Sequence, residues 1–160
     1  MSYLKEVLII KDTDRMFSEN MGRTHVNANN RDRWYLLFAF KLDGVTEKYL
    51  DILLGSVLAR TNDDFVYEFR INQTLRGGSS IPTFNSVTDS DFQIAIGTGE
   101  DYVDDGDKLY AKYVEGNRYD SNGLPSSVLL SGSDELIITC RPVSTNLDIL
   151  SSVNWKEIEI

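Results

Sequence analysis

The chain has little of the residue types that build disulfides, metal sites and activated nucleophiles. It contains one cysteine and one histidine in 160 residues. One cysteine cannot form an intramolecular disulfide, and one Cys with one His cannot complete a structural zinc site. Nucleophilic catalysis of the histidine-activated kind would have to use His25, and no Gly-x-Ser-x-Gly nucleophile elbow occurs. We therefore expect a protein that is not an enzyme, with Cys140, in the apolar run LIITC, as a small buried hydrophobe.

Basic residues and long apolar runs are also scarce. The 16 Lys and Arg residues face 25 Asp and Glu residues, a net charge of −9. Nucleic-acid binding needs a concentrated positive surface, so we expect no nucleic-acid partner. No apolar run approaches the roughly 20 residues that span a bilayer, and the opening MSYLKEVLII has no small-residue cleavage site. We expect no membrane partner, no signal peptide and synthesis in the cytoplasm.

What the sequence does contain is a series of short runs rich in Val, Ile, Phe and Tyr, separated by clusters of Gly, Asn, Asp and Ser. Such runs are typical of strands. The predicted strands are 7–11, 25–28, 33–42, 65–73, 92–97, 108–115, 127–130, 135–142 and 154–160. With 41% hydrophobic residues, the chain can fill one core, so we expect one domain over residues 1–160. The pattern predicts an all-β sandwich of roughly 8–10 antiparallel strands.

Two of these runs predict where the core lies. WYLLFAF, residues 34–40, is apolar at every position, which is typical of a central strand covered on both faces, and this places Trp34 in the core. In FVYEFRI, residues 65–71, large apolar side chains alternate with other residues. One face of this strand should therefore pack in the core, while the face with Glu68 and Arg70 should lie near water.

The segment VTEKYLDILLGSVLAR permits two interpretations. Its large aliphatic residues recur at helical spacing, which suggests a short helix around residues 46–58. Gly55 would lie inside that helix, where glycine costs about 1 kcal/mol relative to alanine. The alternative is a turn followed by a strand over residues 52–59.

The most acidic stretch is GTGEDYVDDGDKLY, residues 97–110, with five carboxylates in eight residues. A helix-loop-helix calcium loop that starts at Asp101 would place Val103 and Lys112 at ligand positions, so that motif is excluded. Two interpretations stay open: a solvated turn between strands, and an irregular calcium loop. The calcium ligands would be Asp101, Asp104, Asp105 and Asp107. No other cofactor is expected.

Exposed aromatic side chains would suggest a surface for a ligand or a partner, because they stack on sugar rings and anchor interfaces. In VNWKEIEI, alternation places Trp155 on the same face as two glutamates and opposite Ile158 and Ile160, so we expect Trp155 on the surface. Tyr102 and Tyr119 lie near the acidic stretch and in a polar loop. Ordinary packing is the alternative for all three aromatic residues.

The order of the segments resembles the jelly-roll domains found in carbohydrate-binding modules, surface proteins and phage particles. NNRDRWYLLFAFKLDGV, residues 29–45, is similar to their recurring strand "Asn-Arg, then Leu-Leu-x-Phe-Asp-Leu", with Lys41 in place of the aspartate. LDILLGSVLAR and FVYEFRI match the next strands loosely, IPTF at 81–84 resembles their "Ala-Pro-Thr-Phe" loop, and WKEIEI at 155–160 resembles their terminal strand. The resemblance implies a jelly-roll β-sandwich and carries over no binding residue.

Two functions fit these observations. The first is a non-enzymatic structural protein of a phage particle, such as a capsid decoration, tail or fibre-associated protein, located in the virion. It would dock with other virion proteins and form a homo-oligomer. Partner subunits would then pair with its edge strands and bury the exposed side of its all-apolar strand. The second is a carbohydrate-binding module, supported by calcium, that binds glycans through aromatic side chains.

Overall fold

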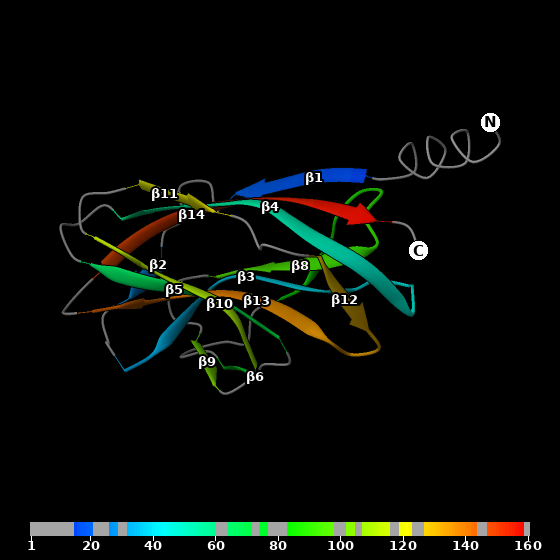
Figure 1. Ribbon diagram of the computed structural model, residues 1–160. Helices are drawn as coiled ribbons and strands as arrows, with labels where there is room; N and C mark the ends of the chain where they lie inside the picture. Colours follow the sequence, from blue (N-terminus) through cyan, green and yellow to red (C-terminus); the bar gives the residue numbers. More distant parts are fainter. Residues whose placement is uncertain are drawn as a thin grey trace.

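Strands make up all the regular structure that can be described. The computed structural model describes residues 15–20, 26–28, 32–59, 64–71, 74–76, 83–97, 102–104, 107–115, 119–122, 127–143 and 147–158 (Figure 1). In chain order the strands are β1 (Arg15–Asn20), β2 (Val26–Ala28), β3 (Trp34–Leu42), β4 (Glu47–Ala59), β5 (Phe65–Ile71), β6 (Thr74–Arg76), β7 (Asn85–Ser86), β8 (Phe92–Ile96), β9 (Tyr102–Asp104), β10 (Asp107–Val114), β11 (Tyr119–Asn122), β12 (Val128–Ser131), β13 (Glu135–Pro142) and β14 (Leu147–Ile158). Within these ranges there is no helix, and so none that could cross a membrane.

The strands form two antiparallel sheets that lie one above the other (Figure 1). The first sheet has six strands in the order β1-β14-β4-β11, with β12 also paired to β4 and β2 to β14. The second has eight strands in the order β10-β5-β13-β3-β8-β7, with β9 paired to β3 and β6 to β9. The chain passes between the sheets repeatedly, for example from β12 to β13 to β14. The predicted all-β sandwich is confirmed, and the finer jelly-roll assignment stays a prediction.

The helical interpretation of residues 46–58 is wrong, because Glu47–Ala59 is the long strand β4. This strand pairs with β14 on one side and with β11 and β12 on the other, so its backbone groups are bonded in the sheet. Leu50 and Ile52 are buried whereas Tyr49 is exposed, which is the alternation of a strand. Tertiary pairing has overridden a local pattern that also fitted a helix.

Several strands have no counterpart among the predicted ones. These are β1, β6, β7, β9, β11 and the first half of β14. Sequences such as TLR and YDSN carry almost no apolar signal, and their strands are short ones paired along a neighbouring strand. In particular, Tyr102–Asp104 forms β9 between β3 and β6, so the acidic stretch is not one simple turn between strands. The predicted strand at 7–11 lies outside the described residues.

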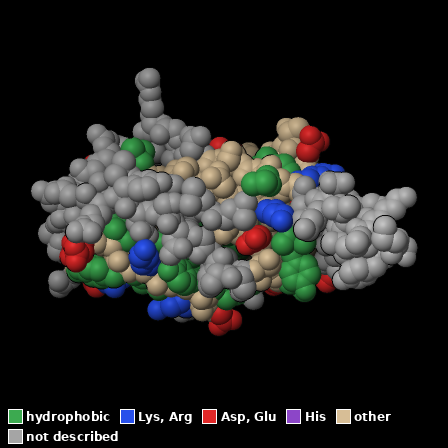
Figure 2. Space-filling model, turned by 45° about the horizontal axis from the view of Figure 1, so that its top comes forward, with side chains coloured by type: hydrophobic (Ala, Val, Ile, Leu, Met, Phe, Trp, Pro, Cys, Tyr) green, Lys and Arg blue, Asp and Glu red, His purple; other side chains and the backbone are tan. Residues whose placement is uncertain are grey.

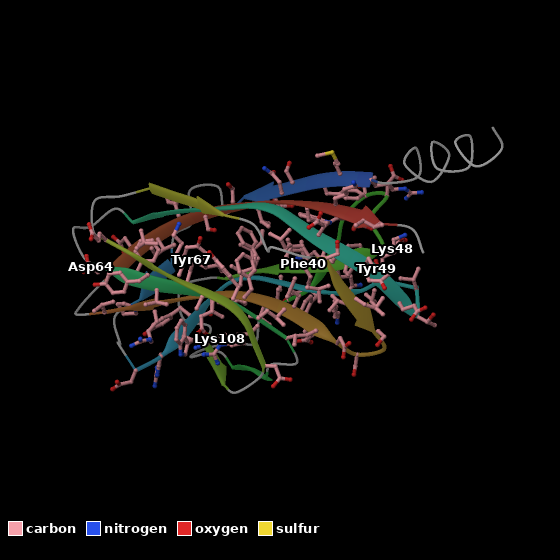
Figure 3. All side chains as sticks on the ribbon, in the orientation of Figure 1. Phe40, Lys48, Tyr49, Asp64, Tyr67 and Lys108 are labelled. Carbon is pink, nitrogen blue, oxygen red and sulfur yellow. The ribbon has the colours of Figure 1, made fainter. Side chains whose placement is uncertain are left out.

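The core lies between the sheets and is centred on β3. Residues 35–40 are all at most 2% exposed, as expected for a strand covered on both faces, and β3 lies between β13 and β8. Phe40 and Tyr67 point into the space between the sheets (Figure 3). Trp34 is a correction: it packs against a separate small cluster on the outer face of the second sheet, where Arg70 and Arg141 lie over its ring at 4.8 and 5.0 Å.

The prediction that Trp155 lies on the surface is wrong, because its side chain is completely buried. Its ring stacks on Phe17 at 5.6 Å and meets Phe40 edge-to-face at 5.0 Å. The alternation correctly placed Trp155 and Glu157 on one face, but that face points inward. Burial of the large indole favours this orientation, provided that the carboxylate of Glu157 finds hydrogen-bond donors inside.

The prediction that Glu68 lies near water is also wrong. The core face of β5 is as predicted, but Glu68, on its other face, is buried instead of lying near water. Arg70 forms a close ion pair with Glu68 Oε1, and Lys108 Nζ lies 2.9 Å from Oε2 in an ion pair that is not aligned as a hydrogen bond. The two cations compensate the buried charge. Cys140 is buried as predicted, and burial raises the pKa of its thiol.

The different positions of the two tryptophans predict different effects on stability. Trp155→Ala removes a fully buried ring and should lower the free energy of unfolding by about 3–5 kcal/mol. Trp34→Ala removes a half-buried ring that contacts two guanidinium groups and should lower it by about 1 kcal/mol. Urea denaturation of the two variants measures both values. Equal losses would contradict this assignment of the core.

Candidate functional site

An exposed hydrophobic row crosses three strands on the outer face of the first sheet. Leu129 of β12 is the cross-strand partner of Tyr49 in β4, and Tyr49 is also the partner of Ile158 in β14. Leu129 is 40% exposed and Tyr49 37% exposed, while Ile158 is half-buried. Direct cross-strand partners touch one another on a sheet face, so the three side chains form one continuous surface.

Met16 extends this surface toward the edge of the sheet. It is 70% exposed and lies opposite Lys156, which in turn lies opposite Asp51. We call the four apolar residues Met16, Tyr49, Leu129 and Ile158 the outer patch. Figure 2, with the top of Figure 1 turned forward, shows hydrophobic side chains beside basic and acidic ones on this face. Single exposed apolar residues are ordinary, whereas neighbouring ones make this face a candidate interaction surface.

Two hollows flank Met16. One, of about 470 Å³, is lined by Arg15, Met16, Phe17 and Asp89. The other, of about 430 Å³, is lined by Met16, Phe17, Ser18 and Asn154. Both hollows are lined by residues of β1, at this edge of the first sheet.

A buried carboxylate holds the sheets together beneath this face. Glu157 is 1% exposed and accepts three hydrogen bonds: from Ser90 Oγ at 2.6 Å, from the backbone N–H of Asp91 at 2.7 Å and from Trp155 Nε1 at 3.1 Å. Ser90 and Asp91 immediately precede β8 of the second sheet, whereas Glu157 belongs to the first. The carboxylate therefore ties the segment before β8 to β14.

Further contacts strengthen the same connection. Lys48, 5% exposed on β4, pairs with Asp91 at 2.9 Å. Arg15 of β1 donates to the carbonyl of Asp89 at 2.6 Å. Within the second sheet, the backbone N–H of Asp43 donates to the carbonyl of Asp91 at 2.9 Å and continues the β3–β8 pairing. Asp89 has a φ of 65°, within the tight turn that Ser90 N–H closes on Val87 O. A carboxylate so enclosed has no access to a substrate, and its role in this geometry is to position the strands that carry the outer patch.

A second polar cluster lies on the outer face of the second sheet. It consists of Trp34 with its two arginines and of Glu68 with its two cations. Thr139, the cross-strand partner of Glu68, is fully buried, and its hydroxyl has no hydrogen-bond partner among the described residues. In this cluster Arg70 and Lys108 pair with the buried Glu68, while Arg70 and Arg141 lie over the ring of Trp34.

The calcium site predicted in the acidic stretch stays a prediction. Asp101 and Asp105 lie outside the described residues, and only the backbone of Asp104 is described, in β9. Asp107 is exposed at the first position of β10. In the part of the chain that the structure describes, no group of three acidic, His or Cys residues could hold a metal ion.

The predicted aromatic surface is wrong at Trp155, which is buried. Tyr102 in β9 and Tyr119 in β11 are described by their backbone only, so their roles stay predictions. The sequence analysis missed Tyr49 and Leu129, because the helical interpretation of residues 46–58 hid the outward position of Tyr49. A strand interpretation would have found it, since Tyr49 alternates with the buried Leu50.

The chain matches no model of a known protein family, and no curated protein matches its sequence. Among solved structures it is similar to a chain in the structure of the infectious bursal disease virus Gx strain, with 11% identity and a TM-score of 0.23. It is also similar to a chain in the T=1 particles derived from infectious bursal virus, with 12% identity and a TM-score of 0.25. Each match covers 92% of this chain, which spans 41% and 40% of those two chains. At these TM-scores the likeness carries no argument.

The buried carboxylate yields a stability prediction. Glu157→Gln keeps the shape of the side chain but turns one acceptor oxygen into an amide donor, which leaves a buried donor such as the N–H of Asp91 unsatisfied. The expected loss is about 1–3 kcal/mol of unfolding free energy, measured by urea denaturation near neutral pH.

Glu135→Gln is the matched control. Burial raises the pKa of the Glu135 carboxyl, so its ionised form is disfavoured in the fold, although Lys41 opposes part of this effect. Folding stability from this group is greatest below the ordinary pKa of glutamate and falls as the pH rises through the higher folded value. The neutral amide should therefore be neutral or stabilising near pH 7. A loss at Glu135 as large as that at Glu157 would contradict the role given to Glu157.

Proposed function

We propose that this chain is a non-enzymatic structural protein of a virus particle, specifically a phage capsid decoration, tail or fibre-associated protein. In this proposal it is made in the host cytoplasm and reaches the virion by docking with other virion proteins. The outer patch is the docking surface. The observation that carries the proposal is the exposed row Leu129–Tyr49–Ile158 with Met16 beside it.

The position of this surface supports docking more than catalysis. The outer patch lies on a broad sheet face instead of in an enclosed cleft, and sheet faces meet partner proteins over a wide area. Its apolar residues are bordered by Lys156 and Asp51, the combination of apolar centre and polar rim that recurs in protein interfaces. The buried carboxylate and its donors keep the strands beneath the surface in register, so docking needs little rearrangement.

Glycan binding has less support than it had from the sequence. The aromatic side chain expected to stack on a sugar, Trp155, is enclosed in the core. The outer patch offers one exposed aromatic ring, that of Tyr49, within an aliphatic surface. A partner protein fits such a surface better than a sugar, which needs polar groups around the stacking ring.

A pair of leucine variants tests the proposal. Leu129→Asp places a charge in the outer patch, and Leu109→Asp places one at a leucine of almost equal exposure on β10 of the second sheet, 41% against 40%. Under this proposal the chain is encoded by a phage, so the purified chain is mixed with particles of that phage, and the fraction of the chain that sediments with them is measured. We expect Leu129→Asp to lower the affinity for particles at least about tenfold, or 1.4 kcal/mol, and Leu109→Asp to leave it unchanged.

Thermal melts of both variants show whether the fold is retained. The docking surface is wrongly assigned if Leu129→Asp sediments with particles as well as the wild-type chain does. A wild-type chain that never sediments with particles contradicts the virion role itself.

A further inference from the structure

The strand β1 forms the outermost edge of the first sheet. One side of β1 pairs with β14 over all six residues, from Arg15 opposite Glu157 to Asn20 opposite Ser152. On its other side, no strand among the described residues pairs with it, and Figure 1 shows it at the border of the sheet. Among the described residues this edge is therefore open, and an open edge presents backbone donors and acceptors that can pair with another strand.

The sequence of β1 is complementary to itself in charge. It reads Arg15, Met16, Phe17, Ser18, Glu19, with a cation two residues before Phe17 and an anion two residues after it. When two such strands run antiparallel about Phe17, Arg15 lies opposite the partner's Glu19, and Glu19 lies opposite the partner's Arg15. Opposite charges at cross-strand positions stabilise a pair of strands, whereas like charges destabilise it.

We propose that two copies of this chain pair through β1, antiparallel and centred on Phe17, so that their first sheets join into one continuous sheet. This interface deepens the proposed docking function, because it names one partner as a second copy. It is isologous, as expected for a two-fold dimer in which the same strand serves both subunits. The charges select this register among those that the two edges could adopt.

The packing around Phe17 supports the same arrangement. Phe17 is half-buried and stacks on Trp155, which meets Phe40 edge-to-face. In the proposed pairing, Phe17 lies directly opposite the partner's Phe17. The aromatic row of one subunit then continues into the row of the other, and the exposed side of Phe17 becomes covered. Aromatic side chains at directly opposite positions are among the favourable cross-strand pairs.

The pairing also brings the two outer patches together. The two-fold axis stands perpendicular to the joined sheet, so both outer faces lie on the same side. Met16 lies opposite the partner's Ser18, close to the axis, and the two hollows along β1 fall within the interface. A dimer would therefore present two docking surfaces to one particle, and simultaneous binding of both strengthens attachment without any new type of contact.

Charge-swap variants test this interface in the purified full chain. Sedimentation velocity over a range of concentrations should give twice the mass of one chain for the wild type. Arg15→Glu and Glu19→Arg each place like charges opposite one another, and each should raise the dissociation constant at least tenfold. An equimolar mixture of these two variants should form a dimer, because each now complements the other. The double variant R15E/E19R restores opposite charges within one chain and should dimerise like the wild type.

Glu47→Arg is the matched control, since it makes the same charge change as Glu19→Arg at an exposed position at the start of β4. It should leave the dimer intact. Circular dichroism verifies the fold of every variant, and recovery in the mixture cannot come from a variant that has failed to fold. A wild-type chain of single-chain mass at every concentration overturns the proposal, as does dimerisation that neither single variant weakens.

The dimer and the docking function can fail separately. Sedimentation of the purified chain requires no particle. A chain that stays monomeric but still binds particles would refute the dimer and leave the docking function in place. A dimer that binds no particles removes the virion role and leaves the β1 interface in place. Leu129→Asp, away from β1, should leave the dimer unchanged.

Discussion

Glu157 is a carboxylate enclosed between two sheets, and its three hydrogen-bond donors come from different parts of the chain. Trp155 belongs to the same strand, whereas Ser90 and Asp91 precede a strand of the opposite sheet. Removing a carboxylate from water is costly unless donors replace the water, and here they do so. The indole of Trp155 can therefore turn inward, stack on Phe17 and hold β1 against β14. The edge strand and the outer patch both depend on this arrangement.

The distribution of polar groups differs between the sheets. The second sheet carries compensated charges on its outer face, where Glu68 is paired with Arg70 and Lys108. On the outer face of the first sheet, the exposed Met16, Tyr49 and Leu129 and the half-buried Ile158 come from four strands and lie close to one another. The net charge of −9 opposes random association of copies, because like charges repel. Association then requires complementary contacts, and β1 with Arg15 and Glu19 at symmetric positions supplies them.

The strands with strong apolar patterns could be predicted from the sequence, and those held by their neighbours could not. WYLLFAF, now part of β3, is apolar enough to predict a strand by itself. The strand predicted at 135–142 has the same bounds as β13. The short β6, β9 and β11 depend on pairing with distant segments. Trp155 shows the limit for the site: alternation places it with Glu157, but burial of the indole and the donors of Ser90 and Asp91 together decide which way the shared face turns. The outer patch was missed because the helical interpretation of residues 46–58 hid the outward position of Tyr49, and because cross-strand register brings its residues together.

The central claim is that the first sheet carries the binding surfaces of this protein: its outer face docks with other virion proteins, and its edge strand β1 pairs with β1 of a second copy. Amide hydrogen exchange of the purified chain, measured at low and high protein concentration, tests it most directly. Exchange at residues 15–20 should slow as the concentration rises, while exchange along β10 at the edge of the second sheet should stay the same. Exchange at residues 15–20 that is equally fast at all concentrations, or slowing confined to the second sheet, would contradict the claim.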